Sequence, residues 1–375
     1  MRIVFTGGGT GGHFYPVIAV IDELNKIIEE KKIVKADIVF MSDSPYDSQI
    51  LFKKGIKFKK IYSGKIRRYF SLLNITDSFK TLVGVIKAVW SIYIDFPDVI
   101  FSKGGYASFP AVFAARVLGI PLIIHESDTV PGKVNAWSGK FAKRVAVSFP
   151  QTAQYFKKEK VALIGNPIRS EFFIPAKIGT RDFFKFQEGV PVILVIGGSQ
   201  GAKKINDVVI DIAPELVNKY QIIHQCGKNN KAETEGRLSV ALGKSPHKSR
   251  YLSYGYLDEN LIRMAYGAAD LVVSRAGSGS IFEIAASGLP SILIPLSNSA
   301  QDHQKENAYS YAKTGAADVV EELNLSPNLL LSEINRLMGD KQGLESMSAA
   351  AKNFSKPNAA KGIAKEILNL ALEHA

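Results

Sequence analysis

The sequence predicts an α/β protein with two similar parallel-sheet domains, and a duplicated glycine-rich turn is the main observation behind this prediction. Short apolar runs at residues 2–6 and 192–196 each end in glycines and are followed by an amphipathic stretch. The two turns read Gly7-Gly8-Gly9-Thr10-Gly11-Gly12 and Gly197-Gly198-Ser199-Gln200-Gly201. A strand that turns on glycine into a helix leaves backbone N–H groups unpaired at the helix start, where anionic groups bind. Matching turns in two halves therefore predict two nucleotide-binding-type domains that face a common cleft.

A second pair of similar segments supports the duplication. Residues 98–108 and 270–280 each run from an aspartate through an apolar strand to a serine, a cation and a glycine turn. The chain has 375 residues, which exceeds the usual size of one domain. We expect an N-terminal domain over residues 1–168, joined by a returning helix at about 349–375, and a C-terminal domain over residues 169–348.

The first half alternates strands and helices, as a parallel sheet covered on both faces requires. The expected strands lie near residues 2–6, 37–41, 57–61, 98–101, 121–124, 144–148 and 160–164. The expected helices lie near residues 15–30, 46–54, 76–94, 107–118 and 132–142. The segment Gly165-Asn166-Pro167-Ile168-Arg169 breaks the pattern with a glycine and an X-Pro pair, which predicts the connector between the domains.

The second half repeats the alternation. The expected strands lie near residues 191–196, 220–225, 250–253, 270–273, 290–294 and 317–320. The expected helices lie near residues 202–217, 258–267, 280–287, 302–313 and 328–338. Beyond about residue 340 the pattern is helical, and the spacing of Ile363, Ile367, Leu370 and Ala371 predicts a final helix that packs back on the first domain.

The composition is that of a globular protein with a sizeable core, since 46% of the residues are hydrophobic and 22% are charged. The lone cysteine, Cys226, excludes an internal disulfide framework and favours a reducing compartment. Met1 and Arg2 lead directly into a strand, so we expect no signal peptide, and no apolar run reaches the roughly 18 residues of a membrane span. These features predict a cytoplasmic location.

The net charge of +12 predicts an anionic partner, which can be nucleic acid, a membrane surface or a phosphorylated substrate. No recognisable nucleic-acid module is present, so nucleic acid is not the expected partner. Cations and apolar residues gather early in the chain, a combination that suits a peripheral protein on anionic lipid. A solvated face over core residues is the alternative. The residues concerned are Lys53, Lys54, Lys57, Lys59, Lys60, Lys65, Ile66, Arg67, Arg68, Tyr69, Phe70, Leu72, Leu73, Ile75, Lys80 and Lys87.

His13 is the first candidate for a catalytic group. It is expected in the first turn of the helix after the first glycine turn, where the helix dipole keeps an imidazole neutral. A neutral imidazole beside a phosphate-facing loop can accept a proton from a substrate hydroxyl. A capping or packing histidine is the alternative, with Thr6 and Thr10 serving as turn residues.

The segment from Arg275 to Glu283 is the richest in the second half. The small residues of Gly277-Ser278-Gly279-Ser280 let backbone N–H and hydroxyl groups approach a diphosphate. Glu283, one turn into the helix, can accept both hydroxyl protons of a ribose. Gln304 both donates and accepts, which suits sugar hydroxyls, whereas a polar helix start capped by Asp302 is the alternative.

Polar residues also follow the strand at 121–124, where the sequence reads His125-Glu126-Ser127-Asp128. Polar groups at the carboxyl ends of strands line the ligand crevice of open α/β sheets, and Arg169 can reach the crevice from the connector. The sequence holds no P-loop, no paired Cys-x-x-Cys, no two-His metal helix and no strand-ending Asp-x-Asp. We therefore expect no metal and no other cofactor, with the diphosphate charge held by helix N-termini and cations.

These segments resemble, in order along almost the whole chain, the N-acetylglucosaminyltransferases of bacterial peptidoglycan synthesis that act on undecaprenyl-pyrophosphoryl-muramoyl pentapeptide, a GT-B family of the glycosyltransferase 28 type. The matching segments are Gly8 to His13 with Pro16, Gly104-Gly105-Tyr106, His125-Glu126, Gly165 to Arg169, Gly197 to Ala202, and Arg275 to Glu283. The resemblance implies a GT-B fold, which has two Rossmann-like domains around a deep cleft and C-terminal helices that cross back. It also implies transfer of N-acetylglucosamine from UDP-N-acetylglucosamine to the 4-hydroxyl of the muramoyl sugar of lipid I, with inversion, to give lipid II.

The resemblance further implies roles for particular positions. The implied donor contacts in the C-terminal domain are Ser199 near the diphosphate, Arg275 near the uracil, Leu257 against the base edge, Glu283 on the ribose and Gln304 on the sugar hydroxyls, with Gly277, Ser278, Gly279, Ser280, Ile281 and Phe282 in the segment between. The implied contacts from the other side are Thr10, Gly11 and Gly12 facing the donor sugar and Arg169 approaching it from the connector. The first loop is expected to receive the acceptor diphosphate, with His13 as candidate base and Glu126 as a second catalytic candidate.

One position departs from the family pattern, because Asp128 stands where the usual His-Glu-Gln-Asn has asparagine. A carboxylate keeps two acceptor oxygens but loses the amide donor, so the donor contact of Asp128 is open. Three other functions also remain open: a different UDP-sugar enzyme such as a transferase or a UDP-N-acetylglucosamine 2-epimerase, a dinucleotide oxidoreductase with Asp43 on a ribose, and a non-catalytic nucleotide-sugar sensor.

Overall fold

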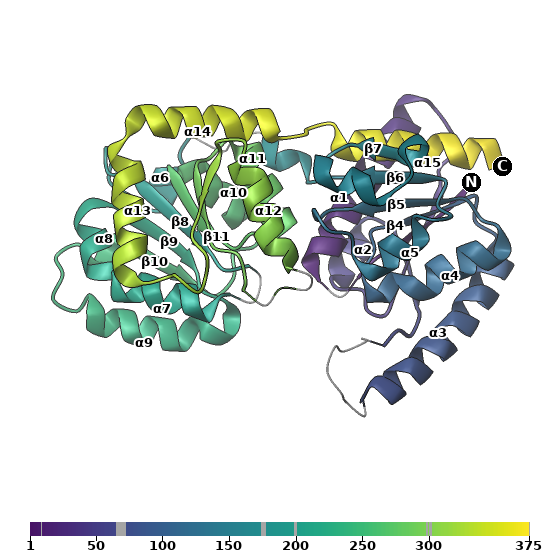
Figure 1. Cartoon of the computed structure of the whole chain (residues 1–375), viewed down its shortest axis with the longest axis horizontal. Helices are drawn as coiled ribbons and strands as arrows, with labels where there is room; N and C mark the ends of the chain where they lie inside the picture. The colour runs from purple at the N-terminus through teal and green to yellow at the C-terminus, as the bar shows by residue number, and fades with distance from the viewer. Residues whose placement is uncertain are drawn as a thin grey trace. The chain divides into compact units, whose positions relative to one another are not determined.

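The structure is a computed structural model, and it describes residues 1–8, 10–64, 73–173, 178–198, 201–297, 299 and 302–374. The chain folds into two compact units. The first unit contains Met1–Arg169 and Lys356–Ala375, and the second contains Ser170–Ser355. Each unit is a parallel sheet with helices on both faces (Figure 1).

The first unit has a 7-stranded sheet in the order β3-β2-β1-β4-β5-β6-β7. All of its strand pairs are parallel. The order reverses between β1 and β4, and such a switch point is where open α/β sheets bind ligands, at the carboxyl ends of the strands. The strands are β1 (Arg2–Thr6), β2 (Asp37–Ser42), β3 (Lys57–Lys60), β4 (Val99–Ser102), β5 (Leu122–Glu126), β6 (Arg144–Val147) and β7 (Val161–Leu163).

Helices cover this sheet on both faces. One face packs against α1 and α15, which bury Ile18, Ile21, Ile363 and Ile367 together in one core cluster. The other face packs against α3 and α4, which contribute Ile92 and Val112 to a second cluster. The helices of the unit are α1 (Gly11–Glu30), α2 (Ser48–Lys53), α3 (Leu73–Asp95), η1 (Tyr106–Ser108), α4 (Phe109–Leu118), α5 (Lys133–Ser138), η2 (Pro150–Tyr155), η3 (Lys158–Lys160) and α15 (Ala359–His374).

The second unit has a 6-stranded parallel sheet in the order β10-β9-β8-β11-β12-β13, with the switch point between β8 and β11. The strands are β8 (Val192–Ile196), β9 (Gln221–Gln225), β10 (Tyr251–Tyr254), β11 (Leu271–Ser274), β12 (Ser291–Leu293) and β13 (Ala317–Val319). The helices are η4 (Ser170–Phe173), α6 (Thr180–Phe183), α7 (Lys203–Asp211), α8 (Ala213–Lys219), η5 (Lys228–Asn230), α9 (Lys231–Ala241), η6 (Lys248–Arg250), α10 (Glu259–Ala268), α11 (Ser278–Ser287), α12 (His303–Ala312), α13 (Pro327–Gly339) and α14 (Lys341–Phe354).

Most elements lie where the sequence pattern predicts them, but several differ. The single helix expected over 202–217 is broken into α7 and α8, because Pro214 lacks a backbone N–H and its ring is accommodated only in the first turn of a new helix. The stretch at 349–375 is also divided, since α14 ends at Phe354 and α15 begins at Ala359, with Pro357 between them. Helix α9 has no counterpart among the predicted elements.

Candidate functional site

The first glycine turn connects β1 to α1 and presents His13 in the first turn of the helix, as predicted. Thr10 is the N-cap residue in an extended conformation, and its carbonyl accepts hydrogen bonds from the N–H groups of His13 and Phe14 at 3.1 and 3.2 Å. The Thr10 hydroxyl lies 3.0 Å from Nδ1 of His13. The cap therefore fixes the direction in which the imidazole points.

A second glycine turn follows β4 and packs against the first. Gly104 and Gly105 have φ values of +87° and +83°, which favour glycine. A Cβ on Gly105 would lie 3.2 Å from the carbonyl of Gly8 and 3.4 Å from Nε2 of His13. Only a residue without a side chain lets the two turns approach this closely, so the structure brings them together at the switch point of the first sheet.

Glu126, at the end of β5, anchors the loop that follows it. Its Oε1 accepts a hydrogen bond from the N–H of Asp128 at 3.1 Å, and its Oε2 accepts from the N–H of Gly132 at 3.0 Å and from Nδ2 of Asn135 at 2.9 Å. Burial and the neighbouring Asp128 raise the pKa of this carboxyl. Both oxygens are used to hold the loop, which favours a structural over a catalytic part for Glu126.

His125 ties β5 to the connector. Its Nε2 lies 2.9 Å from the carbonyl oxygen of Gly165 and 3.3 Å from the Ser148 hydroxyl. The ring is buried, and burial holds its pKa well below the ordinary value, so it is neutral and Nε2–H donates to Gly165. Because Gly165 begins the predicted connector, this bond fixes where the chain leaves the first sheet.

Arg169 lies against the first helix. Its guanidinium carbon is 4.7 Å from the centre of the Tyr15 ring, a cation–π distance. The Tyr15 ring in turn packs edge-on against Tyr46, and a Cβ on Gly11 would lie 2.7 Å from the Tyr46 hydroxyl. The structure thus brings Arg169 close to the first glycine turn, within the first unit.

Asp43 follows β2 and is engaged by two hydroxyl groups. The Tyr106 hydroxyl donates to Oδ2 of Asp43 at 2.8 Å, and the Ser42 hydroxyl donates to Oδ1 at 3.3 Å. Burial and this hydrogen bond raise the pKa of Tyr106. The carboxylate that the oxidoreductase hypothesis assigns to a ribose therefore already has protein partners, and Tyr106 is a neighbour that sequence reasoning missed.

In the second unit, Gln225 clamps the glycine turn after β8. Its Nε2 donates to the carbonyl of Gly198 at 2.9 Å, and its Oε1 accepts from the N–H of Leu257 at 3.0 Å. Gly201 has φ of +77°, and a Cβ there would clash with the backbone carbonyl of Cys226. Leu257 is buried, and its backbone N–H is held by this bond to Gln225. The predicted diphosphate residue Ser199 lies outside the described residues.

The start of α11 has a different character, because its N-cap Gly277 and its second residue, Gly279, are not required for packing. A Cβ added to Gly277 or Gly279 would meet no heavy atom within 4 Å among the residues that the structure describes, and neither has a positive φ. Their lack of side chains leaves open space above the first turn of α11, where backbone N–H groups have no partner within the helix. This is the arrangement that an anionic group needs to approach backbone dipoles.

The rest of α11 divides between core and surface. Ile281 and Phe282 are fully or almost fully buried, and the Phe282 ring lies 5.0 Å from that of Phe354. The side chains of these two predicted contact residues therefore belong to the core. Glu283 is partly exposed, and its Oε2 lies 3.4 Å from the Tyr266 hydroxyl, which can donate to it.

Arg275 is buried and bound to protein groups. Its Nη1 donates to the carbonyl of Ile294 at 3.2 Å, and its Nη2 forms an ion pair with Glu322. Glu322 also accepts from the N–H and hydroxyl of Ser297. Although burial opposes it, the hydrogen bonds from Ser297 and Arg275 lower the pKa of Glu322 to about 2. Arg275 thus holds the segment after β12 in place. The sequence pattern did not reveal this structural role.

Gln304 closes the same segment. Its Oε1 accepts from the N–H of Leu296 at 3.1 Å, while its own backbone N–H donates to the Ser299 hydroxyl at 3.3 Å. The side chain is partly exposed, and these two bonds do not use the donors of its side-chain amide. Gln304 therefore stands at the helix start with its side-chain oxygen already oriented by the backbone.

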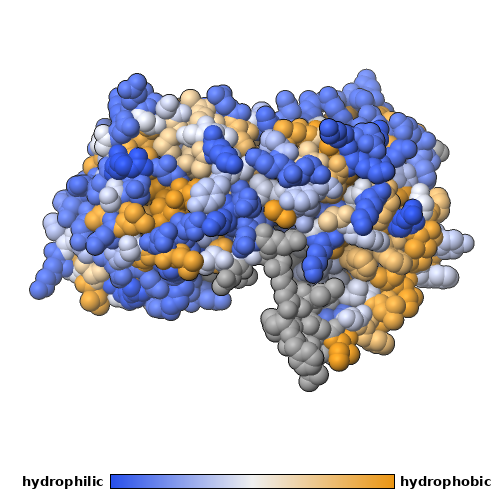
Figure 2. Space-filling model, in the orientation of Figure 1, coloured by the Kyte–Doolittle hydropathy of each residue, from blue (hydrophilic) through white to orange (hydrophobic). Residues whose placement is uncertain are grey.

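An apolar stripe covers the outward face of α3. Its residues recur at helical spacing, and Figure 2 shows an orange, hydrophobic surface over α3 at the lower right. Between half and three quarters of each side chain is exposed in most of them: Ile75 70%, Phe79 67%, Leu82 57%, Val83 39%, Ile86 63%, Trp90 65%, Tyr93 60% and Ile94 63%. We call this set the α3 stripe.

Exposed cations border the α3 stripe. Lys80 and Lys87 lie on the same helix, and Lys60 and Lys87 both lie over the Tyr62 ring, at 5.7 and 5.3 Å from its centre. The predicted patch residues Lys65, Ile66, Arg67, Arg68, Tyr69, Phe70 and Leu72 lie outside the described residues. Within the described part of the chain, no helix is long and apolar enough to cross a bilayer, and no cluster of three or more metal-ligating side chains occurs.

The two parallel sheets, each with a glycine turn leading into a helix at its switch point, define the GT-B fold of nucleotide-sugar glycosyltransferases. The crystal structure of Acinetobacter baumannii MurG is similar over 98% of this chain and 99% of its own, with a TM-score of 0.74 and 26% identity. The UDP-N-acetylglucosamine 2-epimerase of Neisseria meningitidis has a TM-score of 0.68 over 100% of both chains, but at 15% identity this is a similarity of fold alone.

Sequence comparison gives the family. Residues 3–147 match the glycosyltransferase family 28 N-terminal domain, and residues 192–363 match the family's C-terminal domain. The chain belongs to glycosyltransferase family 28. It is 38% identical over 352 residues to the UDP-N-acetylglucosamine–N-acetylmuramyl-(pentapeptide) pyrophosphoryl-undecaprenol N-acetylglucosamine transferase of Clostridium kluyveri, covering 93% of this chain and 95% of that one. The protein of the same name from Lachnoclostridium phytofermentans is 39% identical, with 94% and 95% covered.

Proposed function

We propose that this protein transfers N-acetylglucosamine from UDP-N-acetylglucosamine to the 4-hydroxyl of the muramoyl sugar of lipid I, which gives lipid II and UDP. The observation that carries the proposal is the similarity, over more than nine tenths of the chain, to transferases named for this reaction. The open glycine turn before α11 and the capped His13 supply the two chemical functions that the reaction needs, a diphosphate site and a base.

The first unit binds the acceptor in this proposal. The two glycine turns around His13 present backbone N–H groups to the acceptor diphosphate. When Nδ1–H of His13 donates to the Thr10 hydroxyl, the lone pair is on Nε2, which can take the proton of the attacking hydroxyl. The oxygen attacks the anomeric carbon from the face opposite UDP, so the configuration at that carbon is inverted.

The second unit binds the donor. The diphosphate lies over the start of α11, and its negative charge increases as the bond to the sugar breaks. The N–H dipoles at Gly277 and Gly279 therefore stabilise the transition state more than the ground state. Glu283 accepts from the ribose hydroxyls, and Gln304 contacts the donor sugar. Arg275 contributes by holding the segment that carries Gln304, through Ile294 and Glu322.

In this proposal the protein binds the cytoplasmic face of the cell membrane through the α3 stripe. An amphipathic helix with an apolar outer face and bordering lysines binds anionic lipid in two ways. Its apolar side chains are buried in the bilayer, and its lysines are attracted to the anionic headgroups. The proposed acceptor is lipid-linked, so membrane binding keeps the enzyme at the surface where its substrate diffuses. The exposed fractions of the stripe residues and the position of Lys80 and Lys87 support this assignment.

The decisive experiment is mass-spectrometric detection of lipid II after incubation of the protein with lipid I and UDP-N-acetylglucosamine, with EDTA present. We expect product and UDP in equal amounts. Conversion of the donor without lipid I would instead indicate an epimerase. Donor binding without turnover would indicate a sensor, and binding of NAD in calorimetry would indicate an oxidoreductase.

A further inference from the structure

Lys103 is a lysine buried in the interior of the first unit. It follows β4 directly, its backbone N–H donates to the carbonyl of Thr6 at 2.9 Å, and its side chain is only 1% exposed. Its ammonium nitrogen is buried and has no hydrogen-bond partner among the described residues. An ammonium group in this setting is costly unless nearby charge compensates it.

The compensating charge comes from two carboxylates on the neighbouring strand and loop. Burial lowers the pKa of Lys103 from 10.5 to about 8, while Glu126 and Asp128 act in the opposite direction. Lys103 is therefore mainly protonated at neutral pH. Glu126 ends β5, which pairs with β4, and Asp128 lies two residues further on.

The loop that carries Asp128 depends on the same cluster. Glu126 holds the backbone at Asp128 and Gly132, and it accepts from Asn135. Asn135 also packs on the turn after Lys103, since a Cβ on Gly104 would lie 2.7 Å from its Nδ2. Lys103, Glu126 and Asp128 thus lie around one loop, beside the turn that contacts His13.

The charge balance explains why a carboxylate is tolerated at position 128. With asparagine at position 128, Glu126 would be the one carboxylate of the three-residue cluster, and the buried ammonium of Lys103 would have a single counter-charge. With Asp128 present, two carboxylates repel each other, and that repulsion contributes to the raised pKa of Glu126. A cation at position 103 offsets this repulsion.

We propose that Lys103 is a positioning residue whose buried ammonium neutralises the Glu126 and Asp128 carboxylates together and so fixes the loop at residues 127–132 for the acceptor. The inference rests on the proposed function for its assignment of the acceptor to this edge of the sheet. The placement of Lys103 beside this loop does not depend on the proposed function, because β4 pairs with β5 and Asn135 contacts both Glu126 and the turn after Lys103.

The test compares Lys103→Met, which keeps the length of the side chain without its charge, with the double variant Lys103→Met/Asp128→Asn. We expect Lys103→Met to lower kcat/KM for a soluble lipid I analogue about tenfold, while KM for UDP-N-acetylglucosamine stays within about twofold. The double variant should recover most of the loss, because the uncompensated second carboxylate is gone. Equal loss in the double variant, or an equal change of both KM values, would overturn the proposal.

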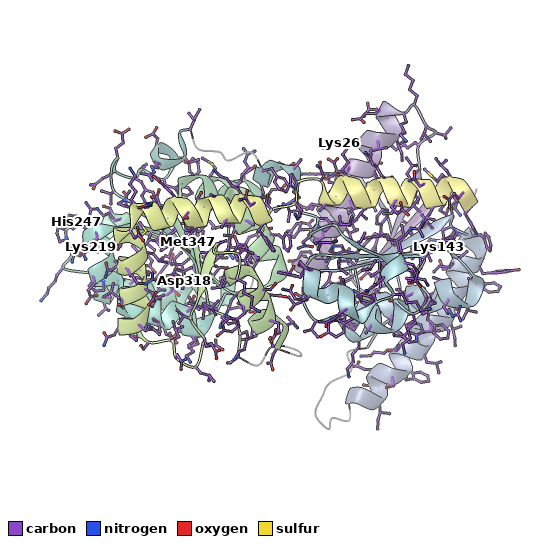
Figure 3. All side chains as sticks on the ribbon, turned by 45° about the horizontal axis from the view of Figure 1, so that its top comes forward. Lys26, Lys143, Lys219, His247, Asp318 and Met347 are labelled. Carbon is purple, nitrogen blue, oxygen red and sulfur yellow. The ribbon has the colours of Figure 1, made fainter. Side chains whose placement is uncertain are left out.

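A second measurement does not depend on transferase activity. Both tryptophans, Trp90 and Trp137, lie in the first unit, so their fluorescence in urea follows the unfolding of that unit. The midpoint should fall for Lys103→Met and return toward wild type in the double variant; strictly additive midpoint shifts would overturn the pairing. The matched control is Lys143→Met at an exposed lysine before β6, labelled in Figure 3, which should change neither quantity. If the wild type forms no lipid II, the proposed function fails while the urea result still decides the pairing.

Discussion

At the scale of single residues, His13 is the group on which the proposed chemistry depends most. Its ring is held by Thr10 on one side and lies against Gly105 on the other. We expect His13→Ala to lower kcat by about 10²- to 10⁴-fold, the usual contribution of a general base, because the acceptor hydroxyl loses its proton acceptor. UDP affinity, measured by calorimetry, should be unchanged. A variant with normal turnover would remove His13 from this role.

Gly279 allows a test in which stability and binding change in opposite directions. An alanine there meets no described atom within 4 Å and improves the helix propensity of α11, so the protein should be stabilised by up to about 1 kcal/mol. The same methyl group occupies the space over the N-terminal N–H groups, so UDP affinity should decrease. Gly236→Ala is the control, since Gly236 lies in α9 with similarly open surroundings and should gain stability with unchanged UDP affinity.

His224 gives the second unit a defined pH dependence. The buried ring lies between the Tyr251 hydroxyl at 2.8 Å and Oδ1 of Asn206 at 3.0 Å, and burial lowers its pKa from 6.5 to about 3. The unfolded chain therefore binds a proton that the folded unit does not bind between these two pH values. Stability should decrease as the pH falls through this window, by at most about 1.4 kcal/mol per pH unit.

The measurement is hydrogen exchange of the β9 amides as a function of pH, in the wild type and in His224→Asn. Other carboxyl and histidine groups titrate in both proteins, so the difference between the two slopes isolates His224. Parallel slopes would show that this ring titrates normally in the folded protein.

At the scale of elements, α3 is unusual because its solvent-facing side is apolar, whereas the outer face of an ordinary surface helix is polar. Replacing Phe79 and Ile86 with glutamate puts charge into the α3 stripe, and we expect binding to anionic vesicles to decrease at least tenfold in co-sedimentation. The loss should persist at high salt, because screening removes the lysine contribution but not the apolar one. Turnover of a soluble acceptor analogue should be retained.

Two exposed apolar residues of the second unit provide the control. Val240 and Leu323 are 84% and 76% exposed, so glutamate at both positions adds the same charge without touching α3. This variant should bind vesicles as the wild type does. Equal binding of both double variants would mean that the α3 stripe has another purpose.

The elements are also the level at which the sequence is most informative. Continuous apolar runs predict the strands within one or two residues, and glycine turns mark the two switch points, because period and backbone freedom are local properties. The break at Pro214 is local too, but the apolar spacing on both sides of it concealed the break. Helix α9 has a weakly patterned, mostly polar surface and so carries little periodic signal.

The sequence predicts on which elements the candidate site residues lie, but it does not predict their hydrogen-bond and ion-pair partners. His13, Gly279 and Glu283 lie where their neighbours in sequence place them. The partners of Lys103 and Arg275 were not predictable, because the carboxylates that act on them lie on other elements: Glu126 and Asp128 for Lys103, and Glu322 for Arg275. Hydrogen-bond and ion-pair partners distant in sequence leave no periodic trace.

At the scale of the whole molecule, α15 is the element that completes the first unit. Ile367 is fully buried in the cluster that α15 shares with α1, so Ile367→Ala should lower the free energy of unfolding of this unit by about 2–5 kcal/mol. Tryptophan fluorescence in urea measures it. Glu366→Ala on the same helix breaks the exposed ion pair with Arg144 and should cost less than about 1 kcal/mol. Comparable costs for both would mean that α15 is held by charge rather than by packing.

The return of α15 to α1 has a consequence for synthesis on the ribosome. Residues 170–355 emerge before residues 359–374. The second unit is therefore complete and able to fold while the first unit still lacks α15, which covers one side of its core. The portion translated first is therefore the portion finished last, and until then the bare side of α1 exposes apolar surface that chaperones recognise.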